Sequence, residues 1–185
     1  MKKKLLTIFL IIFTILLYGQ NKIKGQLIDP YGEIGFSEIK VNNEKIQFDF
    51  DSGKFEIETS KNENIEIDFT LPGYFKLKYI IESKNEMIDL DKVHLIECEN
   101  WLHGPKKGII KDKSDSGVIE SERKIRNWKL HGISKFYNKS GELTQRILFK
   151  KNKPIKIYIL ENGIMKKLKF EFDEKNKIIT VPNNS

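Results

Sequence analysis

The stretch that decides the predicted fold runs from Trp128 to Leu143 and reads WKLHGISKFYNKSGEL. Gly132 opens an alternating segment, which contains the aromatic pair Phe136-Tyr137 and is followed by Ser140-Gly141. Glycine supplies the positive φ that tight hairpin turns require. The stretch therefore predicts a β-hairpin, with one strand on each side of Ser140-Gly141.

This arrangement recurs along the sequence, because a Gly or Pro stands nine residues before a Gly in three places, offset by 24 and then 22 residues. One hairpin cannot bury its own apolar face, so successive hairpins are expected to pair side by side as an antiparallel meander. The first unit lacks the aromatic pair, so it is either a degenerate repeat or a loop. The three pairs are Gly108 and Gly117, Gly132 and Gly141, and Pro154 and Gly163.

Residues 128–143 carry a resemblance to a known family. They are similar to the MORN-repeat variant family, and the similarity extends over about residues 100–172. The exit strands expected after the second and third turns are residues 142–150 and 164–172. The resemblance implies a scaffold more than an activity, and some bacterial members of that family are labelled antitoxins.

The preceding part of the chain consists of short alternating segments separated by turn residues. Seven such segments at this spacing predict a seven-stranded antiparallel β-sandwich. Alternation places Phe55 and Ile57 on one face, opposite Ile67 and Phe69. The predicted strands are residues 23–28, 36–41, 46–50, 55–59, 65–69, 75–79 and 87–96.

These segments resemble the carboxypeptidase regulatory-like family over about residues 22–96. One departure is Asp49-Phe50, where that family usually has Thr-Asp before the turn. The resemblance implies a transthyretin-like sandwich, an accessory module without catalytic residues that is common in exported envelope proteins of Gram-negative bacteria. The matching residues are Lys24-Gly25-Gln26-Leu27-Ile28-Asp29, Gly32, Ile39-Lys40-Val41, Asp51-Ser52-Gly53-Lys54-Phe55 and Gly73-Tyr74.

The first twenty residues have the pattern of a signal peptide. Lys2, Lys3 and Lys4 precede an apolar run from Leu5 to Leu17, which is shorter than the ~20 residues a membrane-spanning helix needs. The sequence therefore predicts export to the periplasm, the outer-membrane surface or the medium. Leu17 and Gly19 make an imperfect cleavage site, so retention as an uncleaved anchor stays an alternative.

Charge divides the rest of the chain into two modules. Residues 21–97 hold 10 Lys and 16 acidic residues, a net of −6, whereas residues 98–185 hold 20 Lys plus Arg and 10 acidic residues, a net of +10. A change of sign of this size indicates a domain boundary. We expect a signal peptide at 1–20, the sandwich at 21–97 and the hairpin repeats at 98–185.

The basic second module contains aromatic residues beside its turns, a composition that suits anion binding. Export disfavours nucleic acid as the partner, and favours an anionic envelope component or another envelope protein, with peripheral membrane contact left open. The plainer interpretation is that the lysines solubilise the strands and protect sheet edges. The candidate binding residues are Trp128, Lys135, Phe136, Tyr137, Lys150, Lys151 and Tyr158.

Nothing in the sequence matches a catalytic or cofactor motif, so neither an enzyme nor a cofactor is expected. His94, Cys98 and His103 lie within ten residues but lack the paired spacing of zinc ligands, and Asp49-x-Asp51-x-Gly53 is better explained as a hairpin turn than as a calcium loop. We expect an exported, non-enzymatic binding or scaffolding protein. An immunity or antitoxin-like protein that neutralises a partner is the alternative, and a catalytic site assembled only in space stays open.

Overall fold

The elements of the protein are all β-strands in the part of the chain described by its computed structural model, residues 20–29, 34, 37–60, 64–82, 87–98 and 105–182. The predicted all-β class is confirmed. No helix among these residues is long and apolar enough to span a membrane. The predicted signal peptide, apart from Gln20, lies outside the described residues.

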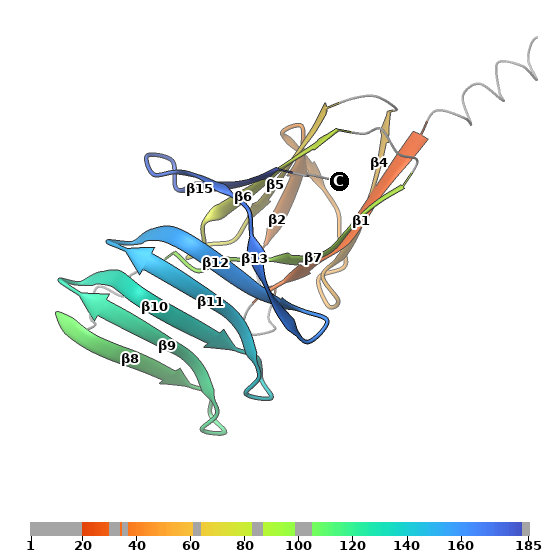
Figure 1. Cartoon of the computed structure of the whole chain (residues 1–185). Helices are drawn as coiled ribbons and strands as arrows, with labels where there is room; N and C mark the ends of the chain where they lie inside the picture. Colours follow the sequence, from red (N-terminus) through yellow and green to blue (C-terminus); the bar gives the residue numbers. More distant parts are fainter. Residues whose placement is uncertain are drawn as a thin grey trace, which may run out of the picture.

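The strands form three sheets (Figure 1). The small sheet consists, in order, of β4 (Lys54–Ser60), β1 (Gln20–Ile28) and β7 (Met87–His94). The long sheet consists of β14 (Glu171–Asp173), β15 (Ile178–Pro182), β6 (Lys76–Glu82), β5 (Asn64–Thr70), β2 (Glu38–Val41) and β3 (Glu44–Ile46). The third sheet, called the meander below, runs in sequence order through β8 (Lys107–Lys113), β9 (Ile119–Arg126), β10 (Lys129–Tyr137), β11 (Leu143–Lys150), β12 (Lys153–Glu161) and β13 (Ile164–Leu168).

The meander confirms the predicted antiparallel arrangement of hairpins. Its six strands are joined at one end by the three predicted turns, where Gly117, Gly141 and Gly163 have φ values of +83°, +80° and +76°. The first unit is therefore a hairpin rather than a loop, although it lacks the aromatic pair. The predicted exit strand at 164–172 is too long, because β13 ends at Leu168 and the chain then leaves for the long sheet.

The small sheet and the long sheet face each other. Of the first seven strands, β1, β4 and β7 belong to the small sheet, and β2, β3, β5 and β6 belong to the long sheet. The expected contact is present, since the rings of Phe55 on β4 and Phe69 on β5 are 5.5 Å apart. The expectation of purely antiparallel pairing is wrong at one place, because β7 runs parallel to β1. Along the chain, β7 follows β6, which belongs to the long sheet. The chain therefore enters the small sheet again from the long sheet, and β7 runs in the same direction as β1.

The C-terminal strands are the main feature that the sequence pattern missed. β14 and β15 form a hairpin, and β15 pairs in parallel with β6, with Ile179 opposite Leu77. Residues 171–182 thus extend a sheet whose other strands lie between residues 38 and 82. Whether residues 21–97 and 98–185 fold independently stays a prediction, which the loss of this hairpin would test.

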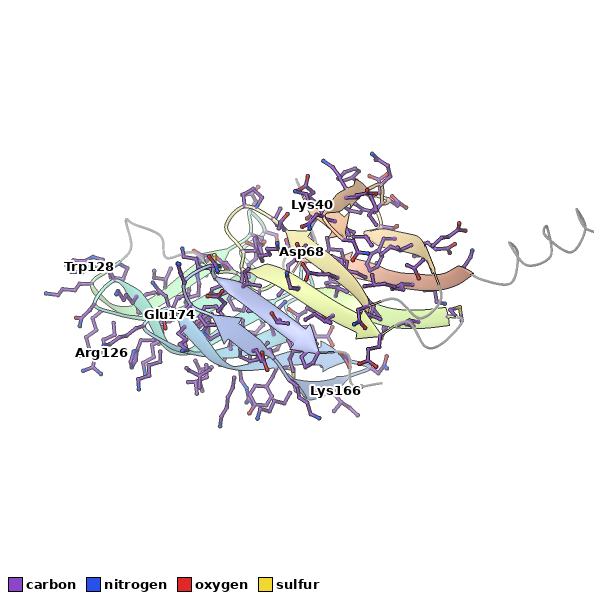
Figure 2. All side chains as sticks on the ribbon, turned by 90° about the horizontal axis from the view of Figure 1, so that it is seen from above. Lys40, Asp68, Arg126, Trp128, Lys166 and Glu174 are labelled. Atoms are coloured by element: carbon purple, nitrogen blue, oxygen red, sulfur yellow. The ribbon has the colours of Figure 1, made fainter. Side chains whose placement is uncertain are left out.

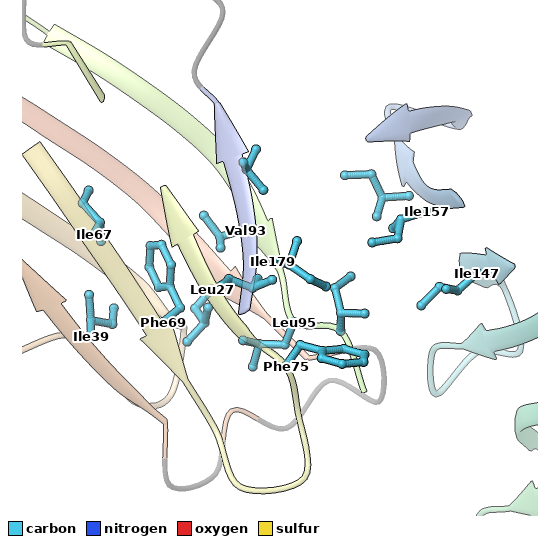
Figure 3. Packing of buried hydrophobic residues seen from close by; sticks show 14 of the residues in the cluster. Leu27, Ile39, Ile67, Phe69, Phe75, Val93, Leu95, Ile147, Ile157 and Ile179 are labelled. Atoms are coloured by element: carbon cyan, nitrogen blue, oxygen red, sulfur yellow. The ribbon is translucent and has the colours of Figure 1, made fainter. Parts of the chain in front are cut away.

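A hydrophobic core extends between the three sheets (Figure 3). Leu27 and Phe69 lie between the small and long sheets, while Ile147 and Ile157 belong to the inner face of the meander. Ile179 of β15 lies near both groups, and it is fully buried. Because most of its inner face is used for packing, the meander presents mainly its opposite face to solvent.

The segment after β7 fastens the meander to the other sheets. Phe75 N–H donates to the Ile96 carbonyl at 2.8 Å, and Gln145 Nε2 of β11 donates to the Leu95 carbonyl at 2.8 Å. In the same region the buried Arg123 of β9 pairs with Glu97, with Nη1 and Oε1 2.5 Å apart. These contacts orient the outer face of the meander away from the rest of the molecule.

Candidate functional site: the outer face of the meander

Alternation along β10 separates the predicted binding residues between two faces. Leu130, Ser134 and Phe136 are buried, whereas Lys135 and Tyr137 point to the other side of the sheet. Successive side chains of a strand point to opposite faces, so Phe136 cannot share a surface with its two neighbours. Phe136 is completely buried in the core, and the exposed candidates lie on the outer face.

One line of outward side chains, called the middle row below, crosses all six strands. Each member lies directly opposite the next in the strand register. Such cross-strand neighbours have Cβ atoms about 4.5–5.5 Å apart, so their side chains interact. The middle row consists of Lys111, Glu122, Lys135, Arg146, Tyr158 and Lys167.

Glu122 holds the first part of the middle row. Lys111 Nζ lies 2.8 Å from Glu122 Oε1, and Lys135 Nζ lies 3.3 Å from Glu122 Oε2, to which the Tyr137 hydroxyl also donates at 3.4 Å. The hydrogen bond from Lys111 is the main reason that the pKa of Glu122 is lowered, and the same bond raises the pKa of Lys111. Both groups therefore remain charged, and the carboxylate fixes two of the cations.

The second part of the middle row has more freely available positive charge. The guanidinium carbon of Arg146 lies 4.5 Å from the centre of the Tyr158 ring. Stacking on an aromatic ring orients a guanidinium while leaving its N–H groups able to bind an anion. Within the described residues, neither Arg146 nor Lys167 makes an ion pair.

A second set of cations gathers where β8 begins and the β9–β10 turn lies. Lys107 is opposite Arg126, and Arg126 is opposite Lys129. Trp128 stands in the turn with 52% of its surface exposed, and Lys106 Nζ lies 5.2 Å from the centre of its ring. Figure 2 shows Arg126 and Trp128 at one end of the molecule.

The neighbouring β11–β12 turn brings Lys150 and Lys151 to the same end. Leu130 N–H donates to Asn152 Oδ1 at 2.6 Å, and Asn152 N–H donates to the Leu130 carbonyl at 2.9 Å. These bonds tie the turn to the start of β10. The predicted residues thus divide into two outer groups: Lys135, Tyr137 and Tyr158 in or beside the middle row, and Trp128, Lys150 and Lys151 at the end.

Sequence reasoning missed several cations that the outer face includes. Lys111, Arg146 and Lys167 belong to the middle row, and Lys107, Arg126 and Lys129 belong to the end group. Each occupies an outward position of its strand, as Lys135 does. Once the strand register is known, period-two alternation identifies them, but the sequence alone leaves the register of the first hairpin undefined.

The residues considered as metal ligands, His94, Cys98 and His103, do not form a cluster within the part of the chain that the structure describes. His103 lies outside that part, and no group of three metal-ligating side chains occurs within it. The Asp49 carboxylate accepts hydrogen bonds from the N–H of Asp51 at 2.9 Å, and from the Ser52 N–H at 3.3 Å and Oγ at 2.6 Å. This is the chemistry of a turn, so the interpretation of this motif as a turn is confirmed.

His94 at the end of β7 is a buried titratable group. Only 6% of its surface is exposed, and neither ring nitrogen has a hydrogen-bond partner among the described residues. Burial lowers its pKa to about 4; Glu161 and Asp91 oppose this shift, and Lys92 adds to it. The neutral imidazole is therefore the form that the folded protein accommodates.

We predict that His94 makes the protein less stable in acid. The unfolded chain binds a proton near pH 6.5, whereas the folded chain does so only near pH 4, so stability is full above about pH 7 and falls as the pH drops between these values. A shift of this size corresponds to a loss of about 3 kcal/mol. Urea unfolding of the wild type and of His94→Leu at pH 7.5 and pH 4.5 measures it.

The His94→Leu variant should lose less stability on acidification than the wild type, by most of that amount. His131→Gln is the matched control, because it keeps His94 and should keep the full pH dependence. Equal pH dependence in the wild type and His94→Leu would contradict the assignment.

The site is thus an extended cationic surface on an all-β protein with several sheets, rather than a closed cavity with converging groups. It offers ammonium and guanidinium donors with aromatic rings beside them. In the comparisons with known proteins, no model of a protein family and no curated protein matches the chain.

Proposed function

We propose that the protein is an exported, non-enzymatic binding or scaffolding protein of the bacterial cell envelope. It holds an anionic envelope component on the outer face of its meander. The single observation that carries this proposal is that outward positions of adjacent strands carry cations in register, with Glu122 as the only acid of the middle row. The basic and apolar pattern of residues 1–20 supports the exported location.

The division of labour proposed within the chain follows the two resemblances. Residues 21–97 are proposed to be a carboxypeptidase regulatory-like sandwich, an idea supported by seven strands in two facing sheets. Residues 98–185 are proposed to include MORN-variant-like repeats, which is supported by three hairpins with offsets of 24 and 22 residues. In this proposal the sandwich supports the meander, and the meander binds.

Cosedimentation tests the function with protein purified from its native host. Binding to vesicles of anionic lipid, and to lipopolysaccharide, should exceed binding to neutral vesicles at low salt. It should weaken strongly at physiological salt, because exposed charges are screened over about 8 Å there. The triple variant Lys135→Gln, Lys150→Glu and Lys151→Glu should bind less without a clearly lower melting temperature, because glutamine at position 135 puts no second carboxylate opposite Glu122. Equal, negligible binding to all surfaces would refute the proposal.

A second candidate function rests on apolar side chains of the same face. Ile109 is 62% exposed and Ile133 is 51% exposed, and both lie at outward positions beside the cations. An acidic partner protein would cover both kinds of side chain, as an immunity or antitoxin-like protein requires. Co-purification of one acidic protein in stoichiometric amount, lost in Ile109→Lys with Ile133→Lys, would support this alternative.

A further inference from the structure

The β9–β10 turn holds a tryptophan in an unfavourable backbone conformation. Asn127 and Trp128 have φ values of +53° and +55°, as the two central residues of a tight hairpin turn. The corresponding second positions of two other turns in the meander are Asn152 and Gly163, with φ values of +69° and +76°. Gly and Asn tolerate this left-handed region, whereas a bulky side chain there is an outlier. Trp128 therefore occupies a position that its own backbone preference disfavours.

Packing does not explain the tryptophan. Trp128 is 52% exposed. It contacts Lys106 at the surface: Lys106 Nζ lies 5.2 Å from the ring centre, and the Lys106 carbonyl accepts a 3.2 Å hydrogen bond from the Trp128 N–H. A residue in a strained backbone conformation that contributes little to the core supports the hypothesis that it has a function. The indole presents a flat apolar surface beside a cation.

The charges around this turn also destabilise the sheet locally. Lys107, Arg126 and Lys129 stand directly opposite one another on three strands, and like charges in such register destabilise a sheet. Among the described residues, no acidic side chain pairs with any of the three. The first part of the middle row differs, because Glu122 lies between Lys111 and Lys135 there, although Lys135 stands opposite Arg146 on the next strand.

We propose that this end of the meander is a binding site for clustered phosphate groups. The site, called the Trp128 corner below, consists of Lys106, Lys107, Arg126, Trp128 and Lys129, with Lys150 and Lys151 on the adjacent turn. The inference rests on the proposed function and names the chemistry of its ligand. A phosphate monoester carries about −1.5 to −2 charges at pH 7, so two phosphates match the charge of the four cations Lys106, Lys107, Arg126 and Lys129, which a pair of carboxylates does not. The Arg126 guanidinium offers bidentate hydrogen bonds to phosphate oxygens, and the indole covers the apolar or ring portion of the ligand.

Intrinsic fluorescence reports on the site directly, because the chain has two tryptophans. In a Trp101→Phe background, Trp128 is the single emitter. Addition of inorganic tripolyphosphate should change its emission in a saturable way that weakens with salt. Citrate, a tricarboxylate, should bind about ten-fold more weakly. Equal affinity for citrate would overturn the assignment to phosphate.

Paired variants locate the binding, measured by calorimetry with tripolyphosphate. Arg126→Gln with Lys129→Gln should weaken binding about ten-fold or more. Lys40→Gln with Lys45→Gln removes the same charge from β2 and β3, where Figure 2 shows Lys40 far from Trp128, and should change affinity less than about two-fold. If Lys111→Gln with Lys135→Gln weakens binding as much as the Arg126 and Lys129 pair, the anion is held diffusely. The proposed function then stands and this inference fails.

Trp128→Gly separates binding from folding. Glycine suits the turn, so this variant should melt at the same or a higher temperature while binding tripolyphosphate about five-fold more weakly. Unchanged binding would overturn the role of the indole. Vesicles containing phosphatidic acid, compared with phosphatidylglycerol vesicles of equal charge, distinguish a lipid phosphomonoester from a soluble source. Failure of the wild type to bind any anionic surface or polyphosphate would instead remove the proposed function itself.

Discussion

Truncation of the chain after Leu168 is expected to abolish the cooperative unfolding of the protein. The truncation removes β14 and β15, and with them the fully buried Ile179, the buried Val181 and the ring of Phe172, which lies 5.3 Å from that of Phe75. Each such loss of core packing costs about 2–5 kcal/mol, and a domain has only about 5–15 kcal/mol in total. The removal of β15 also leaves the backbone of β6 without its partner on that side.

Circular dichroism during urea titration measures this effect. The truncated chain should show no sigmoidal transition, whereas a chain that ends at Pro182 should unfold like the full protein. Ile179→Ala is the point variant, with an expected loss of about 2–5 kcal/mol. A truncated chain that melts cooperatively close to the temperature of the full protein would contradict the expectation, and would favour independent folding of residues 21–97.

Replacement of Arg123 by Met should have the next largest effect, a loss of about 3–5 kcal/mol. Arg123 is 3% exposed, and its two terminal nitrogens contact Glu97 and Asp112. Asp112 Oδ2 also accepts a hydrogen bond from Ser121 Oγ at 2.6 Å. Without the guanidinium, the buried carboxylate of Glu97 loses this ion pair, and the cost of breaking a buried pair exceeds the value of the intact pair.

Chemical denaturation of three variants tests whether the broken ion pair with Glu97 causes this loss of stability. Arg123→Met with Glu97→Gln should be more stable than Arg123→Met alone, because the second change removes the buried negative charge that Arg123 balances in the wild type. Lys124→Met is the control, since Lys124 is the exposed neighbour on the outer face, and it should cost less than about 0.5 kcal/mol. A loss below about 1 kcal/mol in Arg123→Met would show that the pair does not fasten the meander.

The two predictions concern the same structural fact, which is that the meander does not stand apart from the other sheets. Glu97 from the end of the first region meets Arg123, and Gln145 donates to the Leu95 carbonyl. In addition, β15, which follows the meander in the sequence, pairs with β6 of the long sheet. The outer face of the meander, the binding face of the proposed function, is therefore held by contacts at its back, and a site built from several cations needs such support.

By itself, the sequence determined the local features of this protein. Alternation predicted most strands, and the glycines of the three turns predicted the hairpins, because these patterns depend on neighbouring residues and on φ. The facing pair Phe55 and Phe69 followed from the same alternation. The predicted strand at residues 46–50 is wrong. β3 spans Glu44–Ile46 and ends before Phe48 and Phe50, although these aromatic residues continue the alternation.

Only the tertiary structure decided which side chains share a surface. Phe136 and Tyr137 are adjacent in the sequence, yet one is in the core and the other on the outer face, and only the packing of the inner face tells which. The parallel pairs β1–β7 and β6–β15 join segments far apart in the chain, and no local pattern encodes the partner of a strand. The cation rows arise in the same way, because their members come from different strands and meet only when the register of the sheet is set.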